Sequence, residues 1–325
     1  MHPNWVIRPV TEDDFSIIAA TESGVRLEPI SEDQIREWVT LDRADPEFPI
    51  EWIVIEERHP EGSETPAFLG WGTWGKGRWL APDERHIRLT VVPSKRRMGI
   101  GSFMLDYLET QVKRDNPKAI HAWGRSADKD SIQWAEKRGY VVVRERPVSE
   151  LDLSGFDEEQ FSADLEHLRL AGIEIRTIWD DGIGPYMQGL FQVARATHRD
   201  VPFRSPDAAD LDYKSWVREY EESASRKVFA VAIHDGKVIG YSDVWMPVVD
   251  GQSALVEYTA VLKEYRGKGV GLATKVASTA AAAKAGAKSL RTTNDPDNPA
   301  ILHLNQRMGF RSRPGKVLLK KTLRN

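Results

Sequence analysis

Cysteine is absent from this chain of 325 residues. Without it the protein has no disulfide, no thiolate metal ligand and no cysteine nucleophile. The eight histidines are scattered and none lies four residues from another, so the sequence gives no sign of a transition-metal site. No apolar run is long enough to cross a bilayer, and the first residues lack the charged-then-apolar order of a signal peptide. We therefore expect a cytoplasmic protein without a membrane partner.

Neither sign of charge dominates. The formal net charge is −4, which gives no reason to expect nucleic acid as a partner. The 41% hydrophobic and 29% charged residues are ordinary for a globular protein, and the length favours about two domains. The G-x-x-x-x-G-K-[ST] loop of many nucleotide hydrolases is missing, and no G-x-G-x-x-G fingerprint extends from Gly101 or Gly271, because the residues three positions further on are Met104 and Thr274.

What the chain does contain is a repeat. The pattern R-x-x-G-x-G occurs from Arg96 to Gly101 and again from Arg266 to Gly271, at an offset of 170 (266 − 96). At the same offset, Gly139-Tyr140 recurs as Gly309-Phe310, and Leu69-Gly70-Trp71 recurs as Ile239-Gly240-Tyr241. Three landmarks in one register indicate two copies of one fold. We expect domains at residues 1–153 and 173–325, joined by a helix within 154–172.

Each copy predicts the same order of elements. In the second half, apolar periodicity and the Asp235-Gly236 hairpin signal predict strands at 173–177, 227–233, 237–245, 254–262 and 289–292, and helices at 186–197, 213–222, 270–285 and 300–307. The first half predicts strands at 5–10, 50–56, 67–74, 86–92, 119–122 and 149–152, and helices at 12–20, after the loop to 113, and ending near 138. This pattern is an α+β fold.

Each glycine loop joins a predicted strand to a predicted helix. The first backbone N–H groups of a helix have no partner within the helix, and its dipole adds partial positive charge there. Glycines without Cβ let a diphosphate approach the main chain, and the leading arginine adds a forked donor. A lone R-x-x-G-x-G is a weak signal, but two in register in the same setting predict that the ligand carries phosphates.

With these motifs the chain resembles the GNAT superfamily of acetyl-CoA-dependent N-acyltransferases. The likeness rests on Arg266 to Ala273 with Asn294, Asn298, Asn305 and Gly309-Phe310, and in the first half on Arg96 to Ser102 with Gly139-Tyr140. The two-domain plan is similar to that of tandem GNAT proteins such as mycothiol synthase. The resemblance implies two tandem GNAT folds, each a mixed, mostly antiparallel sheet flanked by helices.

The resemblance also implies site residues. The cofactor would be held by Val261, Arg266, Gly267, Lys268, Gly269, Val270, Gly271, Leu272, Ala273, Asn294, Asn298 and Asn305, and in the first half by Val91, Arg96, Arg97, Met98, Gly99, Ile100, Gly101 and Ser102. The backbone N–H near Thr259 (or Leu89) would polarise the thioester carbonyl. Glu257 would be the general base, although a solvated strand carboxylate is as common.

The general acid stays open. Many relatives use a tyrosine four residues before the Gly-Phe pair, and here that position is Asn305, or Ala135 in the first half. Tyr258 or water could serve. Because the second half keeps three asparagines where the first has Gly124, Asp128 and Ala135, we expect the C-terminal half to be catalytic and the N-terminal half at most to bind cofactor.

The sequence supports several functions. The first is transfer of acetyl from acetyl-CoA to a primary amine of a small molecule, by a monomer or homodimer. Alternatives are another acyl donor, a peptide N-terminus as acceptor, or a non-catalytic acetyl-CoA-binding regulatory or scaffold protein. His198 lies near the expected acceptor cleft, but packing is the commoner role of such a histidine. Trp216 and Trp245 are candidate cleft residues, with core packing as the alternative.

Overall fold

The computed structural model describes residues 4–26, 28–58, 65–202, 204–221, 226–249 and 252–323. The chain forms two compact units. The N-terminal unit contains Met1–Arg144, Ser205–Ala209 and Val317–Asn325. The C-terminal unit contains Glu145–Arg204 and Asp210–Lys316.

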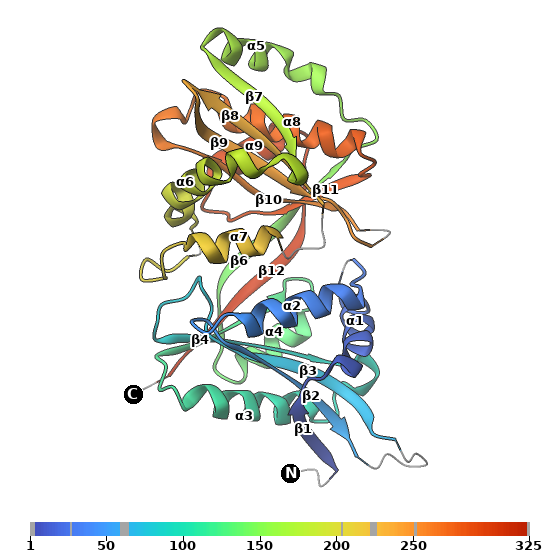
Figure 1. Cartoon of the computed structure of the whole chain (residues 1–325). Helices are drawn as coiled ribbons and strands as arrows, with labels where there is room; N and C mark the ends of the chain where they lie inside the picture. The colour runs from blue at the N-terminus through green and yellow to red at the C-terminus, as the bar shows by residue number, and fades with distance from the viewer. Residues whose placement is uncertain are drawn as a thin grey trace. The chain divides into compact units, whose positions relative to one another are not determined.

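The N-terminal unit is a sheet with helices on both faces (Figure 1). Its strand order is β1-β2-β3-β4-β5-β12, and neighbours from β1 to β4 are antiparallel whereas β4 and β5 are parallel. Its elements are β1 (Trp5–Pro9), α1 (Phe15–Ser23), α2 (Glu32–Ala44), β2 (Ile50–Glu57), β3 (Ala67–Gly75), β4 (Glu84–Val91), α3 (Ile100–Lys113), β5 (Ala119–Arg125), α4 (Lys129–Glu136) and the second half of β12 (Arg311–Thr322).

The C-terminal unit repeats this plan. Its strand order is β7-β8-β9-β10-β11-β6, in which β10 and β11 are parallel and the other neighbouring strands are antiparallel. Its elements are the second half of β6 (Val141–Asp152), α5 (Ser162–Leu170), β7 (Ile173–Trp179), α6 (Met187–Thr197), α7 (Tyr213–Glu221), β8 (Lys227–His234), β9 (Lys237–Trp245), β10 (Ala254–Val261), α8 (Val270–Lys284), β11 (Ser289–Thr293) and α9 (Pro299–Arg307).

Two strands divide between the units. The unit boundary falls within β6 after Arg144 and within β12 after Lys316. Each unit therefore contains a strand segment from the far half of the chain, which the repeat in the sequence does not reveal. The predicted domain boundaries, at residues 1–153 and 173–325, stay a prediction.

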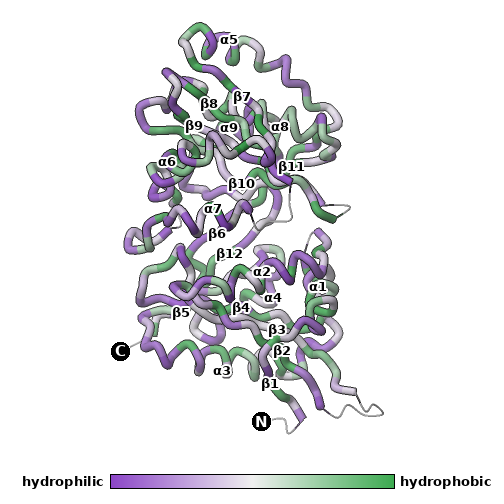
Figure 2. The backbone as a smooth tube through the Cα atoms, viewed as in Figure 1, coloured by the Kyte–Doolittle hydropathy of each residue, from purple (hydrophilic) through white to green (hydrophobic). Residues whose placement is uncertain are grey.

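Alternation along the strands places the cores. In β2, Ile53 and Ile55 pack with α3, while Trp52 and Val54, which point to the opposite face, pack with α1 and α2. In the C-terminal unit, Val228 packs with α8 and its neighbour Phe229 packs with α6 and α7. Hydrophobic stretches, green in Figure 2, run along β8 and β9. Each sheet is thus covered on both faces.

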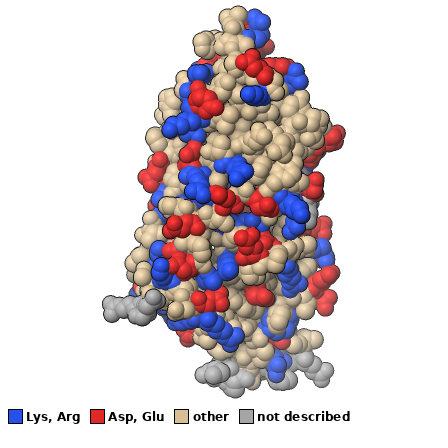
Figure 3. Space-filling view, turned by 60° about the vertical axis from the view of Figure 1, so that its left-hand side comes forward, with Lys and Arg blue, Asp and Glu red and all other residues tan. Residues whose placement is uncertain are grey.

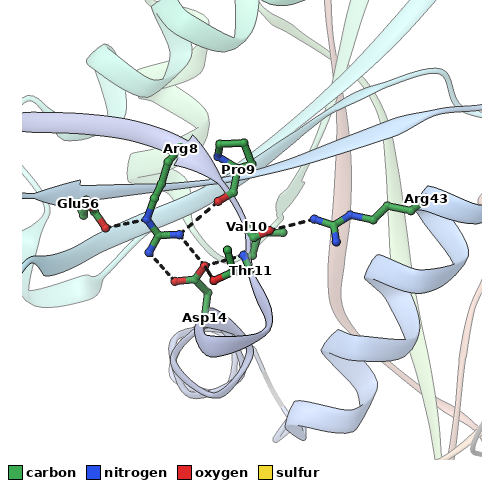
Figure 4. A network of polar contacts seen from close by, with 7 residues as sticks. All are labelled: Arg8, Pro9, Val10, Thr11, Asp14, Arg43 and Glu56. Carbon is green, nitrogen blue, oxygen red and sulfur yellow. Dashed lines mark hydrogen bonds and ion pairs between the residues drawn. The ribbon is translucent and has the colours of Figure 1, made fainter.

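The start of α1 is fastened to the sheet by a polar network (Figure 4). Arg8 of β1 donates to both carboxylate oxygens of Asp14 at 2.7 and 2.8 Å, and to Glu56 of β2 at 2.9 Å. Burial of Asp14 works to raise its pKa, but the hydrogen bonds from Arg8 and Thr11 together bring the pKa below its ordinary value. This forked arginine sets the angle at which the chain enters α1.

Most predicted elements are present, with boundaries shifted by a few residues. Helix α2 was not predicted; it begins at a capping box in which Ser31 accepts from the N–H of Gln34, and the side chain of Gln34 accepts from Ser31. The chain after Phe310 forms the single long strand β12. On the face drawn in Figure 3, basic and acidic side chains are intermixed, as the small net charge leads one to expect.

The duplicated glycines before the aromatic landmarks, Gly70 and Gly240, lie against neighbouring backbone. A Cβ on Gly240 would lie 2.9 Å from the carbonyl oxygen of Ala260, and one on Gly70 would collide with that of Thr90. We expect Gly240→Ala to lower the free energy of unfolding by about 1–3 kcal/mol, because the strands cannot separate without losing their pairing. Gly155→Ala, where a Cβ has open space, is the matched control for urea denaturation. Equal stability of both variants would contradict this packing.

Candidate active site

The two glycine loops have the same backbone conformation. In the first, Arg97 and Gly99 have φ of 65° and 90°, and in the second, Gly267 and Gly269 have φ of 74° and 89°. Gly99 and Gly269 are the residues directly before α3 and α8. The predicted strand–loop–helix setting is therefore confirmed for both copies. Of these four left-handed residues, Arg97 alone is not a glycine. The backbone of the first loop is therefore strained at Arg97, whereas the second loop has glycine at both positions.

The second loop fits a diphosphate. A Cβ built on Gly267 or Gly269 would meet no atom within 4 Å, so the space in front of the backbone is open. Behind the loop, a Cβ on Gly271 would reach ordinary contact with Val261 at 3.5 Å and Leu304 at 3.6 Å. One side of the loop thus packs against β10 and α9, and the other side is open. An anion that binds to the backbone N–H groups at a helix N-terminus needs such an open side.

The charged surroundings of the two loops differ. In the first unit, Arg97 pairs with Asp130 at 2.6 Å and Arg96 lies 3.7 Å from Asp128, both carboxylates coming from α4 and its cap. At the same offset, α9 of the second unit carries Asn298 and Ala300. Arg266 donates to the carbonyl of Val261 at 3.0 Å and pairs with Asp200. Helix α9 therefore adds no carboxylate beside the second loop, where Asp200 is the acidic partner of Arg266.

The parallel strands beside each loop separate. Strands β10 and β11 pair only at Ala254 with Leu290 and at Leu255 with Arg291. Strands β4 and β5 pair from Glu84 to Ile87 on the β4 side. Within the described residues of these strands the parallel pairing ends there, so the later part of β10 or β4 has backbone groups that no parallel neighbour takes. These groups lie on the strand that runs directly into the glycine loop.

Strand β10 carries a bulge. Its register with β9 shifts between Val256, opposite Val244, and Thr259, opposite Ser242, so Glu257 and Tyr258 both lie across from Asp243. The carboxylate of Asp243 fills the irregular place by accepting the N–H of Tyr258 at 2.7 Å. In the first unit, β3 and β4 pair without a shift from Gly70 to Gly75. Bulges often re-aim side chains next to active sites, and here only the second copy has one at this position.

The bulge brings two carboxyl groups together in an unusual environment. Asp243 has no solvent exposure, and burial, with the charge of Glu257 next, raises its pKa to about 7. The indole N–H of Trp245, 3.0 Å from Asp243, opposes this by stabilising the anion. Burial among protein atoms also raises the pKa of Glu257, and Lys316 and Arg146 oppose the rise. Glu257 is reached by solvent, so screening weakens its interactions more than those of Asp243.

Comparison with known families gives a clear result. The model of the acetyltransferase (GNAT) family matches residues 21–140 and again residues 190–310. The chain belongs to the GNAT acetyltransferase family. It is an acyltransferase with two tandem GNAT folds, as the motifs predicted. GNAT enzymes generally use acetyl-CoA.

Solved structures show the same tandem fold. A tandem GNAT protein from the clavulanic acid biosynthesis pathway is 19% identical, with 98% of each chain covered and a TM-score of 0.74. A GCN5-related N-acetyltransferase from Sphaerobacter thermophilus is 17% identical, with 100% of this chain and 98% of that chain covered and a TM-score of 0.68. The comparison with curated proteins gave no match. Within the described residues, no helix has the length and apolar character needed to span a membrane.

The structure places the predicted GNAT catalytic residues together at the bulge. Glu257, Tyr258 and Thr259 follow one another on β10, with Thr259 Oγ1 3.0 Å from Ser242 Oγ. The phenol oxygen of Tyr258 lies 3.2 Å from Thr197 of α6. Their catalytic roles stay predictions. Asp243 was missed by the sequence reading, although a lone carboxylate inside the apolar run of β9 was a usable signal.

The three asparagines that were predicted to hold the cofactor form hydrogen bonds with other groups of the protein. Asn298 caps α9 by accepting the N–H of Ile301 at 3.2 Å. The amide of Asn305 donates to Asn294 at 2.5 Å, and both are buried. Asn305 in turn accepts from Lys275 of α8, a buried residue that the sequence reading also missed. Their role in holding the cofactor stays a prediction.

The other candidate cleft residues have structural contacts. His198 is buried, with Nδ1 2.6 Å from the carbonyl of Arg195. Trp216, a residue of α7, is buried in the core and packs with α6. Trp245 is partly buried and donates to Asp243. Of the three, only Trp245 contacts the carboxylate pair.

The second loop allows a direct test of cofactor binding. We expect Gly271→Glu to weaken acetyl-CoA binding to the C-terminal unit by about 100-fold or more, because the side chain would fill the space bordered by Val261, Leu304 and Thr259 and would bring a negative charge next to the loop that holds the diphosphate. Calorimetric titration measures the affinity, and circular dichroism checks the fold. Gly155→Glu, at an open surface position, is the control. Unchanged affinity in Gly271→Glu would remove the diphosphate from this loop.

Proposed function

We propose that the protein transfers an acetyl group from acetyl-CoA to a primary amine of a small molecule, with the C-terminal unit as the catalytic one. The observation that carries this proposal is the bulge in β10. It gathers Glu257 and Asp243 beside a strand whose parallel neighbour has separated, directly before an open glycine loop.

In this proposal, each part of the unit has a distinct task. The N–H groups of Gly267 to Ala273 and the guanidinium of Arg266 hold the diphosphate, and Val261 lies under the arm that follows. Acetyl-CoA, when bound, supplies an acyl group activated as a thioester. The N–H near Thr259 polarises the carbonyl, an effect on the order of 10²–10³ in rate for one such donor.

The carboxyl pair serves the amine. An amine attacks only when neutral, so a base has to remove a proton from its ammonium form. Glu257 is accessible to solvent and carries a raised pKa, which suits that task near neutral pH. Asp243, with no solvent access, holds the bulge through the N–H of Tyr258 and keeps a second carboxyl group next to Glu257. Asp243 is thus a positioning residue.

The N-terminal unit lacks these parts. At the positions of Glu257, Tyr258 and Thr259 it has Ile87, Arg88 and Leu89. Arg88 pairs with the buried Glu22 and lies 4.5 Å above the ring of Trp71. We infer that this unit does not turn over, and that its loop, with Asp128 and Asp130 beside it, binds acetyl-CoA more weakly than the second loop.

Aromatic side chains beside the carboxyl pair support an amine as acceptor. Tyr220 of α7 lies 4.6 Å from Trp216 and 5.8 Å from Trp245 between ring centres. Its hydroxyl lies 3.4 Å from Asp243. Rings and a carboxylate at one place favour a cationic group, and the ammonium of the buried Lys227 lies 5.0 Å from the centre of the Trp245 ring at this place. Other acyl donors, a peptide N-terminus and a protein that binds acetyl-CoA without turnover are the outcomes that would replace the proposal.

An amine screen with loop variants tests the proposal. We expect wild type to release CoA with at least one small primary amine. Arg266→Ala should raise KM for acetyl-CoA about tenfold, the effect of one lost charged hydrogen bond, and Arg96→Ala should leave turnover unchanged. Stabilisation by acetyl-CoA without CoA release from any amine or peptide would mean a binding protein. Loss of activity in Arg96→Ala alone would move catalysis to the N-terminal unit.

The raised pKa values give a pH prediction. A base acts only when deprotonated, so a raised pKa moves the loss of activity to higher pH. We expect kcat/KM to fall as Glu257 takes up a proton, and this fall should occur above the pH of about 4.3 at which an unperturbed glutamate would be half protonated. Glu257→Gln should lower kcat/KM about 10²–10⁴-fold.

The amine itself also titrates, and acceptors of different basicity separate the two effects. The limb that belongs to the carboxyl pair stays in place from one amine to the next, whereas the limb that belongs to the amine moves. A profile that moves entirely with the amine, together with an active Glu257→Gln variant, would exclude Glu257 as the base.

A further inference from the structure

Three polar side chains form a buried chain of hydrogen bonds in the C-terminal unit. Lys275 of α8 donates from Nζ to Oδ1 of Asn305, and Asn305 donates from Nδ2 to Oδ1 of Asn294 at 2.5 Å. Their exposed fractions are 1%, 3% and 7%. The ammonium nitrogen of Lys275 also lies 4.8 Å from the centre of the Phe310 ring. The mechanism above uses none of these contacts.

The first unit shows that the fold does not need them. At the offset of 170, Lys275, Asn305 and Asn294 correspond to Leu105, Ala135 and Gly124. Leu105 and Ala135 are buried in the core of the N-terminal unit, in the same setting between α3 and α4. One copy of the fold therefore fills these positions with apolar groups and the other fills them with a lysine and two amides.

Burying these three polar side chains costs free energy. A buried amine loses its hydration, and burial lowers the pKa of Lys275 to about 7. Burial alone accounts for this lowered pKa, so no carboxylate among the described residues compensates Lys275 for its lost hydration. A strongly perturbed group that packing does not require is a candidate for function, provided that it lies at the site.

The set lies where β10 and β11 separate. Asn294 follows the last residue of β11, beyond the last pair of that strand with β10. A Cβ on Gly271 would lie 3.6 Å from Leu304 and 4.0 Å from Thr259, so α8, α9 and β10 meet at the gap. Lys275 is one helical turn after Gly271 on the same face, and Asn305 directly follows Leu304. The three groups thus border the end of the gap that lies beyond Thr259.

We propose that Lys275, Asn305 and Asn294 form a site that stabilises the thiolate leaving group of the acyl donor. One N–H of the Asn305 amide is held by Asn294, and the other is the donor to sulfur. Lys275 acts through Asn305: as an ammonium on the carbonyl oxygen, it polarises the amide and strengthens that donor. Lys275 is therefore a positioning residue. The inference rests on the proposed function of the C-terminal unit.

The reaction balances without an added group. The amine nitrogen forms the new bond to the acetyl carbon, the C–S bond breaks, and its electron pair stays on sulfur. Glu257 releases to water the proton that it took from the ammonium form, and the proton that the nitrogen loses after its attack then passes to Glu257. Lys275 keeps its protons, and the thiolate takes its proton from water after it leaves. Asn305, four residues before Gly309, thus stabilises the leaving thiolate without the tyrosine that many relatives have at this position.

The test compares Lys275→Leu and the double variant Lys275→Leu with Asn305→Ala against wild type, all as the full chain. These changes introduce the residues that the N-terminal unit has at the matching positions, Leu105 and Ala135. We therefore expect melting temperatures no lower than that of wild type. Lys284→Leu, at an exposed lysine on the same helix that pairs with Glu158, is the matched control.

The direct readout needs no turnover. Free CoA is titrated on the protein, and the ultraviolet absorbance of the thiolate gives the pKa of the bound thiol, with desulfo-CoA as the blank. We expect this pKa to lie below that of free CoA in the same buffer for wild type and Lys284→Leu, and to rise by about one pH unit in the two Lys275 variants. Affinity for desulfo-CoA should be the same in all four proteins. In turnover, kcat should fall about 10–100-fold with KM for acetyl-CoA unchanged.

The outcomes separate this inference from the function beneath it. A bound thiol whose pKa is the same in wild type and Lys275→Leu overturns the thiolate site and leaves the acetyltransferase proposal standing. Lower melting temperatures in both Lys275 variants with unaltered thiol titration would assign the three residues to packing. Failure of wild type to bind CoA in the C-terminal unit would overturn the proposed function itself.

Discussion

The separation of β10 from β11 is the constraint on which the rest of the site depends. Two parallel strands that share only the pairs at Ala254 and Leu255 leave the remainder of β10 with unused backbone groups on one side. The same strand continues into the loop that begins α8, so donors for a phosphate and donors for an acyl arm follow along one chain. The bulge at Glu257 and Tyr258 then adds carboxyl groups on the other side.

The duplication separates what the fold requires from what the chemistry requires. Both copies have a parallel pair that opens, a loop with two left-handed residues and a helix that begins after the second of them. Only the second has the bulge, the Asp243 carboxylate and the buried Lys275. Arg88 and Glu22 in the first copy bond to each other instead. The shared features are therefore those of the backbone, and the differences lie in the side chains that face the gap.

Buried ionisable groups at the gap between β10 and β11 distinguish the second copy. Asp243 and Lys275 both lose hydration, and each has its pKa moved toward neutrality by burial, upward for the acid and downward for the amine. Hydrogen bonds from Tyr258 and Trp245 compensate Asp243 in part, and Asn305 does so for Lys275. Groups placed in this way can change protonation near neutral pH, which solvated carboxylates and amines do not.

The sequence by itself determined the duplication, the strand–loop–helix setting of both loops and the family, because spacing, glycine and apolar periodicity are local signals. It also placed Glu257, Tyr258 and Thr259 next to one another. Only the tertiary structure decided that β6 and β12 divide between the units, and that Asp243 and Lys275 lie at the gap. Burial and register are properties of neighbours far away in the chain: Asp243 matters because β9 meets a bulge in β10, and Lys275 because α8 meets α9. No pattern within β9 or α8 alone records those neighbours.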